Sequence, residues 1–282
     1  MISKTDTRIE KTQFWYFFFI SSTKYKKLYI KILFTIKFNH FWYNINMRKL
    51  DYIPRTKLKM IHVEGAYSFG IDSILLGDFA KMKKNKILLD IGSGNGILAM
   101  MANGLYDLEK VYAVEIQEAK AKILKENLDL NGIKNIEIIN EDLNKIDIKE
   151  NSLDYIITNP PYYKIDQNIK NNDEEFLISR QELYLNLDDI FAFANKTLKD
   201  KGKLFMIHKP ERMVEIFNKC GNVKAKRIQF ASSTYNTKPQ FILIEFVKNA
   251  KDGIKIEDPI IIYKDGKYTD QVRKINGTYK ED

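Results

Sequence analysis

Short apolar runs recur along most of the chain and alternate with segments of helical periodicity. Runs of this kind, four to six residues long, are typical of strands buried on both faces of a parallel sheet. They cover Ile87–Ile91, Lys110–Val114, Ile136–Ile139, Leu153–Thr158 and Leu204–His208. Between the second and third runs, residues 117–130 place apolar side chains at helical spacing. Alternating strands and helices predict an α/β fold with a doubly wound sheet.

Two further apolar segments change the expected sheet near its end. Arg227–Phe230 and Phe241–Val247 flank a polar loop and are expected to form an antiparallel pair. The predicted fold is therefore a doubly wound, mostly parallel, seven-stranded Rossmann-like sheet with an antiparallel edge strand. Upstream, Leu58–Val63 alternates weakly, as an edge strand does. Asp72 and Ser73 are expected to cap the helix that follows them.

A glycine-rich loop, Gly92-Ser93-Gly94-Asn95-Gly96, separates the first buried run from a helix start. Strand, glycine loop and helix in this order predict a nucleotide-binding unit, because glycines let the backbone approach a ligand closely. The loop lacks the third glycine placement of the dinucleotide fingerprint. Asp90, just before it, would repel a pyrophosphate and suits an ammonium group instead. These features favour S-adenosylmethionine over NAD.

Acidic residues follow the next two strands. Glu115 ends the second run, about twenty residues past the loop, where an acid can accept hydrogen bonds from two ribose hydroxyls. Asp142 follows the third run and is expected to accept from an adenine amino group. Glu141 is its neighbour, and the sequence does not decide which of the two points inward.

The fourth run leads directly into Asn159-Pro160-Pro161-Tyr162. Two successive prolines cannot continue a sheet, because neither has an N–H for the ladder. Asn159 therefore lies at the carboxyl edge, where open α/β sheets bind ligands. The Asn159 oxygen and the Pro160 carbonyl can accept from an NH2 group, and the Tyr162 ring can stack on the plane that carries it. This set predicts a site for a planar amine.

Composition limits the remaining options. The single cysteine, Cys220, excludes an internal disulfide and is typical of the reducing cytoplasm, and no Cys/His spacing indicates a metal site. The net charge is +9, but residues 1–46 contribute +6 of it, and the other 236 residues carry 38 basic and 35 acidic groups. The charge thus permits an anionic partner without requiring one.

Residues 1–46 differ from the rest of the chain. They hold 13 of its 35 aromatic residues, and lysines interrupt every apolar stretch before one is long enough to span a bilayer. The sequence from Met47, Met-Arg-Lys-Leu, is typical of the first residues of a protein. We therefore expect two regions: an N-terminal extension over 1–46, disordered or absent from the native protein, and one domain over 47–282. No stable membrane association is expected.

The order of these motifs resembles that of the class I S-adenosylmethionine-dependent methyltransferases, and the Asn-Pro-Pro-Tyr form resembles their amine-methylating branch. Within that branch the chain is similar to the tRNA(Val) adenine N6-methyltransferases, over Met47 to about Tyr279. Three further stretches carry the closer similarity: residues 69–76 (Phe-Gly-Ile-Asp-Ser-Ile-Leu-Leu), 208–212 (His-Lys-Pro-Glu-Arg) and 259–263 (Pro-Ile-Ile-Ile-Tyr) with Tyr268-Thr269. The resemblance implies a monomeric enzyme that methylates adenine 37, next to the anticodon, after the base is flipped into its pocket.

The resemblance also implies a role for each matching residue. Asn159, Pro160 and Tyr162 would be the catalytic residues, with no metal. The cofactor, S-adenosylmethionine, would contact Phe69, Gly70, Asp90, Gly92, Gly94, Gly96, Glu115, Asp142 and Asn159.

Two other enzyme classes share the Asn-Pro-Pro-Tyr motif. A protein-glutamine methyltransferase presents an amide nitrogen to the same acceptors, but residues 47–84 are short for the helical domain those enzymes usually carry. A DNA adenine methyltransferase usually adds a target-recognition domain, for which the chain has no room. A non-catalytic binding module would predict a broken motif, whereas here all four residues are present.

Overall fold

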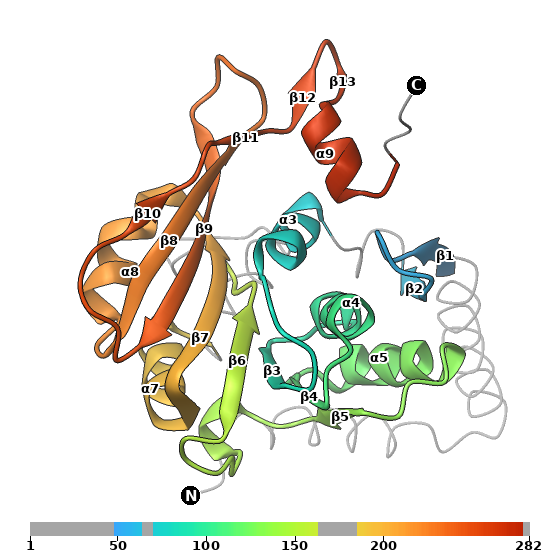
Figure 1. The fold of residues 1–282 in the computed structure, drawn as a ribbon. Coiled ribbons are helices and arrows are strands. Elements are labelled where there is room, and N and C mark those ends of the chain that lie inside the picture. Colours follow the sequence, from blue (N-terminus) through green and yellow to red (C-terminus); the bar gives the residue numbers. More distant parts are fainter. Residues whose placement is uncertain (1–47, 64–69, 163–184, 279–282) are drawn as a thin grey trace, which may run out of the picture. The chain divides into compact units, whose positions relative to one another are not determined.

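The computed structural model describes residues 48–63, 70–162 and 185–278 (Figure 1). The expectations for residues 1–46 and for Phe69 lie outside these ranges. The chain divides into two units, Met1–Arg48 and Lys49–Asp282, and the account below concerns the second. None of the described helices is long and apolar enough to cross a membrane.

A nine-stranded sheet forms the centre of this unit, in the order β10-β8-β9-β7-β6-β3-β4-β5, with β11 also paired to β8. From β5 to β7 all neighbours are parallel, and β9 runs antiparallel to both β7 and β8. The predicted α/β class and mostly parallel sheet are confirmed. The strands are β3 (Ile87–Ile91), β4 (Lys110–Val114), β5 (Ile136–Ile139), β6 (Leu153–Thr158), β7 (Leu198–His208), β8 (Val223–Ser232), β9 (Pro239–Lys248), β10 (Lys255–Ile256) and β11 (Ile260–Ile261).

The sheet differs from the expected one in strand number and in the place of its antiparallel strand. Two added strands, β10 and β11, have two residues each, too few to produce an alternating pattern. The antiparallel strand β9 lies inside the sheet, because its continuous apolar run is buried on both faces. Strand β8, which is half-buried along much of its length, lies next to β9 on the side away from β7, and β10 and β11 pair with its other side.

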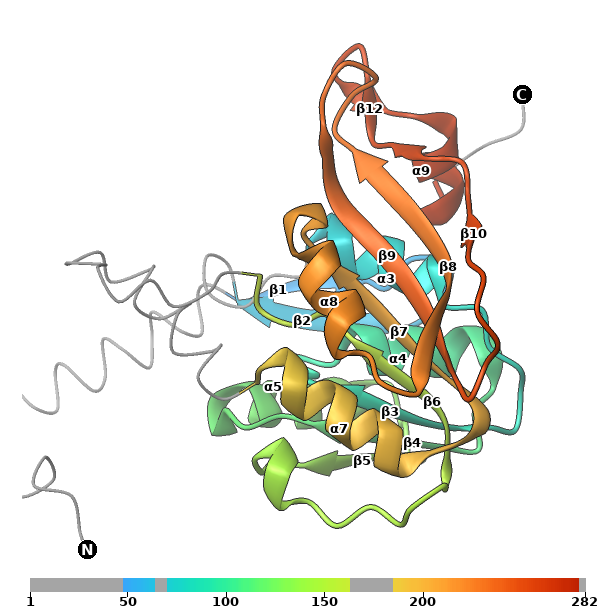
Figure 2. The ribbon, with the colours of Figure 1, turned by 90° about the vertical axis from the view of Figure 1, so that its left-hand side faces the viewer.

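Helices cover both faces of the sheet and enclose two cores. Helices α3 (Ile71–Phe79), α4 (Ile97–Tyr106) and α5 (Glu118–Leu130) pack on one face, and α7 (Leu187–Thr197) and α8 (Met213–Lys219) on the other. Figure 2 shows α7 and α8 in front of the sheet. Neighbouring strand residues such as Leu88 and Leu89 enter opposite cores, as the alternation of a strand requires. Two 3-10 turns, η1 (Leu143–Lys145) and η2 (Pro210–Arg212), follow β5 and β7.

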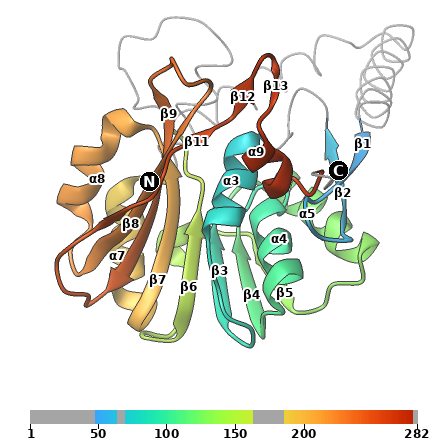
Figure 3. The same cartoon turned by 45° about the horizontal axis from the view of Figure 1, so that its top comes forward.

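The segments at the two ends of the unit add smaller elements. Strands β1 (Arg48–Tyr52) and β2 (Lys59–Val63) form a separate two-stranded sheet, so the edge strand expected there pairs outside the main sheet. It is joined to α5 by Asn127, whose side chain bonds both the N–H and the carbonyl of Ile61. After β11 come the hairpin β12 (Tyr263–Lys264) and β13 (Lys267–Tyr268) and then α9 (Asp270–Ile275), which contacts α3 (Figure 3).

Candidate active site

A cavity of about 350 Å³ opens at the carboxyl ends of β3, β4 and β6. Strand β3 has β4 on one side and β6 on the other, so this is the point where the strand order reverses and open α/β sheets bind their ligands. The wall combines residues from the glycine loop, the second and third strand ends and the Asn-Pro-Pro-Tyr motif. They are Asp72, Ile91, Gly92, Val114, Glu115, Ile116, Gln117, Lys120, Glu141, Leu143, Asn159, Pro160, Pro161, Tyr162 and Leu185.

The glycine loop takes a backbone path that other residues rarely adopt. Gly92, Gly94 and Gly96 have φ values of +70°, +57° and +95°, in the left-handed region where a Cβ is unfavourable. A Cβ on Gly96 would also lie 2.2 Å from Leu124 Cδ1 on α5. The loop therefore requires glycine at position 96 both for its conformation and for the close approach of α5.

Glu115 is almost fully buried, at 4% exposure, and still reaches the cavity. Its Oε2 accepts from the Gly94 N–H and its Oε1 from the Gln117 N–H, both at 2.8 Å. A carboxylate has about four acceptor sites, so two backbone donors leave acceptor capacity for hydroxyl groups. Its ribose role stays a prediction that this geometry supports.

Asp90 lies beneath the loop rather than on the cavity wall. It is fully buried, its Oδ2 accepts from the Ala99 N–H at 3.0 Å, and its Oδ1 has no partner. Burial raises the pKa of this carboxyl to about 8; the Ala99 N–H lowers it and the nearby Glu115 charge raises it. Its predicted contact with an ammonium stays a prediction, while its observed contact joins β3 to α4.

The two acids after β5 have different surroundings. Asp142 is the N-cap of η1 and accepts from the Asn144 N–H at 2.9 Å. Glu141 lines the cavity, although Asp142 does not. The adenine contact expected of Asp142 stays a prediction, and Glu141 is the neighbour placed to compete for it.

Asn159 and Tyr162 are held by one aspartate from a distant element. The Asn159 amide donates to Asp72 Oδ2 and to Ser73 Oγ, both at 3.1 Å. The Tyr162 hydroxyl lies 2.6 Å from both Asp72 Oδ2 and Asn159 Oδ1. The amide nitrogen faces α3 and the amide oxygen faces the Tyr162 hydroxyl, and both residues line the cavity. The motif is thus oriented by α3 as well as by its own strand.

Neither Asp72 nor Ser73 is the N-cap of α3; that position is Gly70, which makes no side-chain cap hydrogen bond. Of the expected capping, one bond is present: Asp72 Oδ1 accepts from the Ser73 N–H at 2.8 Å. Asp72 lies within the first turn instead, where its carboxylate can turn toward β6. A Cβ on Gly70 would lie 2.5 Å from Asp72 Oδ1, so the glycine makes room for that carboxylate. Gly70 does not line the cavity, and its cofactor contact stays a prediction.

Aromatic and basic residues from β7 and β9 surround the Tyr162 ring. The His208 ring packs edge-on at 5.5 Å between centroids, and the Phe241 ring lies at 5.9 Å. The Lys209 Nζ lies 5.1 Å from the centre of Tyr162 and 4.5 Å from that of Phe241. Burial, with a smaller contribution from the Arg212 charge, lowers the pKa of His208 to about 4. His208 therefore stays neutral at pH 7 and packs as a ring rather than as a cation.

The charges of the cavity wall favour a cationic ligand. Three carboxylates line it, from Asp72, Glu115 and Glu141, against one ammonium from Lys120. A net negative, partly buried wall attracts cations and repels phosphates. Among the described residues no group of three or more His, Cys, Asp or Glu side chains could hold a metal ion.

A comparison with protein families shows which family has this sequence pattern. The model of the methyltransferase small domain matches residues 58–230, more than half of the chain. The chain belongs to the methyltransferase small domain family. It is an S-adenosylmethionine-dependent methyltransferase, which confirms the enzyme class and cofactor that the sequence predicted.

Two curated relatives of this methyltransferase are named tRNA1(Val) (adenine(37)-N6)-methyltransferase. The protein from Haemophilus influenzae is 28% identical over 225 residues, which are 77% of this chain and 94% of the relative. The protein from Proteus mirabilis is 30% identical over 213 residues, 72% and 82% of the two chains. These matches confirm the resemblance that the motifs indicated.

Solved structures agree with the methyltransferase fold. A predicted O-methyltransferase from Agrobacterium tumefaciens, protein Atu636, matches 73% of this chain and 96% of its own, with a TM-score of 0.59 and 18% identity. TYW2 from P. horikoshii, in complex with MeSAdo, matches 72% of each chain with a TM-score of 0.52 and 15% identity. At these identities the likeness concerns the fold alone.

The described residues of the methyltransferase fit S-adenosylmethionine. The cavity volume lies within the range of small-molecule sites, its wall is net negative, and Glu115 retains acceptor capacity for ribose hydroxyls. Sequence reasoning did not identify Asp72 as part of this site. The signal available was the Asp-Ser pair at a helix start, and capping is the usual explanation of such a pair.

Proposed function

We propose that this methyltransferase transfers a methyl group to N6 of an adenine in tRNA, and that the target is adenine 37 of tRNA(Val). The names of the relatives from Haemophilus influenzae and Proteus mirabilis support this substrate. The intact Asn159-Pro160-Pro161-Tyr162 motif at the cavity supports an exocyclic amine as the acceptor.

The orientation of the Asn159 amide carries the proposal. Asp72 and Ser73 bind its nitrogen, so its oxygen is left as an acceptor at the cavity, one residue before the Pro160 carbonyl. Two acceptors side by side match the two hydrogens of an NH2 group. They would draw those hydrogens out of the plane of the base and localise the nitrogen lone pair.

In this proposal Tyr162 frees the acceptor when the amine arrives. Its hydroxyl has one hydrogen and two acceptors at 2.6 Å, Asn159 Oδ1 and Asp72 Oδ2. Donation to Asp72 leaves Asn159 Oδ1 for the target amine. The same change keeps the Tyr162 ring in place to stack on the base, which would offset part of the cost of unstacking it from the RNA.

S-adenosylmethionine supplies a methyl group on a positively charged sulfur, so no covalent intermediate with the protein is required. The residues of the chain have to hold the amine nitrogen in line with that methyl at about 3–3.5 Å. The acceptors also stabilise the positive charge that develops on the nitrogen. The residues we propose to contact the cofactor are Phe69, Gly70, Asp90, Gly92, Gly94, Gly96, Glu115, Asp142 and Asn159.

Nucleoside mass spectrometry tests the proposal. We expect N6-methyladenosine in tRNA(Val) from cells that hold the gene and its loss on deletion. Purified protein should restore it on an unmethylated tRNA(Val) transcript, but not on a transcript with guanine at position 37. An unchanged nucleoside profile, with methyl transfer to a glutamine of a translation factor, would replace this proposal by the protein-glutamine alternative.

A further inference from the structure

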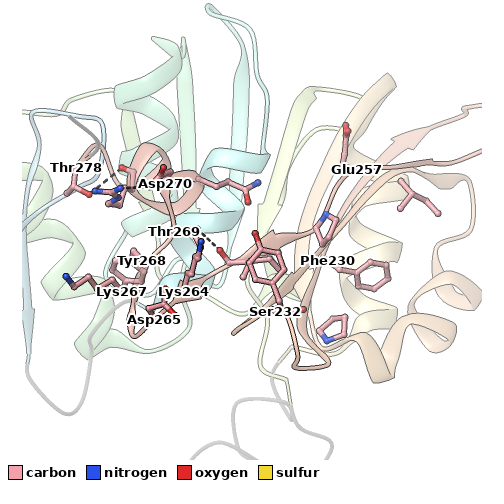
Figure 4. Close-up of a pocket in the computed structure, with 17 residues that line it drawn as sticks. Phe230, Ser232, Glu257, Lys264, Asp265, Lys267, Tyr268, Thr269, Asp270 and Thr278 are labelled. Carbon is pink, nitrogen blue, oxygen red and sulfur yellow. Dashed lines mark hydrogen bonds and ion pairs between the residues drawn. The ribbon is translucent and has the colours of Figure 1, made fainter. Parts of the chain in front are cut away.

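A second and larger hollow, of about 1320 Å³, lies between the loop of the β8–β9 hairpin and the C-terminal segment. Figure 4 shows residues of its two sides, Phe230 and Ser232 on β8 and Lys264, Lys267 and Tyr268 on the β12–β13 hairpin. We name this hollow the hairpin cleft. None of its lining residues belongs to the methyl-transfer cavity described above. The role of these residues therefore requires a separate explanation.

The wall of the hairpin cleft carries Lys264, Lys267 and Arg273 against Glu257, Asp265 and Asp270, and the segments around it are more basic. Residues 232–240 and 262–278 together carry five Lys or Arg and two Asp, a net charge of +3. Residues 47–282 as a whole carry 38 basic and 35 acidic groups, also +3, so the rest of the domain is neutral overall. Of the acids on the cleft wall, Glu257 is paired with Lys255 and Asp270 with Arg273. With Glu257 and Asp270 paired in this way, Lys264 and Lys267 are the cleft cations that can bind an anion.

Two lysines of the cleft lie directly opposite each other. Lys264 pairs with Lys267 across the β12–β13 ladder, and like charges in that position are unfavourable unless an anion lies between or above them. The turn that joins them, Asp265-Gly266, has φ values of +51° and +72°, as in the tight two-residue hairpin turn. Their mutual approach is thus fixed by the backbone.

Exposed aromatic rings accompany these charges. Tyr235, in the loop of the β8–β9 hairpin, is 74% exposed, and Tyr268 is 40% exposed while stacked on Tyr263. Both line the cleft. Lysines beside exposed rings are the combination that binds single-stranded nucleic acid, because the lysines contact phosphates and the rings stack on bases.

The cleft begins close to the methyl-transfer site. Phe241 contacts the Tyr162 ring, and Pro239, two residues earlier on β9, lines the cleft. Two strand residues span roughly 7 Å. The loop of the β8–β9 hairpin also lies at the carboxyl end of β8, which runs parallel to β6 and β7, so the cleft and Asn159 share one edge of the sheet.

We propose that the hairpin cleft binds the tRNA strand that flanks the target adenine. Lys264 and Lys267 contact phosphates, and Tyr235 stacks on an unpaired base. This inference rests on the proposed function, because it names where the same substrate is held. It accounts for an affinity that the methyl-transfer cavity alone, with its net negative wall, does not provide.

The test compares two double variants that each remove two positive charges. Lys264→Ala/Lys267→Ala alters the cleft. Lys134→Ala/Lys149→Ala is the matched control, since both lysines are exposed and lie before β5 and β6, at the opposite edge of the sheet. The probe is an unmodified tRNA(Val) transcript. We expect the cleft variant to raise the tRNA Kd at least tenfold and to reduce the slope of log K against log salt by roughly 1.5, with the cofactor Kd unchanged.

A second pair of variants tests stacking without a change of charge. Tyr235→Ala should raise the KM for tRNA roughly tenfold, whereas Tyr235→Phe keeps the ring and should stay near the wild-type value. Equal tRNA affinity in the cleft and control variants, or equal KM in Tyr235→Ala and wild type, would overturn the cleft proposal while wild-type protein still methylates tRNA. A wild-type protein that methylates no tRNA would instead overturn the proposed function.

Discussion

The two halves of the active-site cavity are held in different ways. In the half formed by β3 and β4, backbone N–H groups of Gly94 and Gln117 bind Glu115, and glycines fix the loop. In the half formed by β6, side chains bind side chains: Asp72 holds both Asn159 and Tyr162. A backbone-held site is formed once the sheet folds, whereas a side-chain network can exchange partners. In the reaction proposed above, the backbone-held half would hold the cofactor in place, and the side-chain network would exchange hydrogen-bond partners when the target amine arrives.

Removal of the Asn159 side-chain amide, in the β6 half, should cause the largest loss of activity. We expect Asn159→Ala to lower kcat roughly 100- to 1000-fold, as loss of one acceptor for developing charge does in comparable sites. Because the β3–β4 half is independent of Asn159, the Kd for the cofactor should change by less than about threefold. Single-turnover methyl transfer and calorimetric titration measure the two quantities. A kcat within tenfold of wild type would contradict the assigned role.

A methyl group added at Gly96 should destabilise the glycine loop of the β3–β4 half. Gly96→Ala places a Cβ 2.2 Å from Leu124 at φ +95°, and we expect it to lower the free energy of unfolding by about 2–4 kcal/mol and to weaken cofactor binding. Gly94→Ala is the control, since its Cβ would meet nothing within 4 Å; its cost should be about 1–2 kcal/mol, from the backbone alone. Equal losses in urea denaturation of both variants would argue against the clash.

Replacement of the bridging carboxylate should give a smaller change. We expect Asp72→Ala to lower kcat by roughly 10- to 100-fold, because two hydrogen bonds to a charged group are lost. Asp72→Asn, which keeps one acceptor oxygen, should recover part of the rate. Asp78→Ala is the matched control: Asp78 lies on the same helix but pairs with Arg55. If Asp78→Ala lowers kcat equally, the effect belongs to the helix and not to the bridge.

The pH dependence of stability tests the buried carboxyl beneath the glycine loop. The pKa of Asp90 is raised to about 8 in the folded protein, while in the unfolded chain it is ordinary. Between pH 4 and pH 8 the folded state therefore binds more protons, so this group's contribution to stability is present at low pH and is lost as the pH rises through that window. Asp90→Asn should remove this dependence in the cofactor-free protein, measured as the free energy of unfolding from pH 5 to pH 8. An unchanged slope would show that Asp90 ionises normally.

The same contrast explains what could be predicted from the sequence. Strand runs, the glycine loop and the position of Asn159 follow from local rules on burial, proline and glycine, and these were predicted. The bonds from Asp72 to Asn159 and Tyr162 cross 87 and 90 residues, and no local pattern reports a partner that far away. The cavity position of Glu141 depends in the same way on how the turn after β5 meets η1. Strands β10 and β11 were missed because two residues cannot show a period.

The short strands β10 and β11 also affect the tendency of the protein to aggregate in concentrated solution. Strand β8 is ten residues long, and as a bare outer strand it would offer a row of unpaired backbone groups to another molecule. Instead β10 covers Arg227 and Ile228, and β11 covers Ala231 and Ser232, with Pro259 between them unable to donate to a further strand. The C-terminal chain thus protects the sheet from edge-to-edge aggregation, and shortening it from Lys255 onward would make the purified protein prone to self-association.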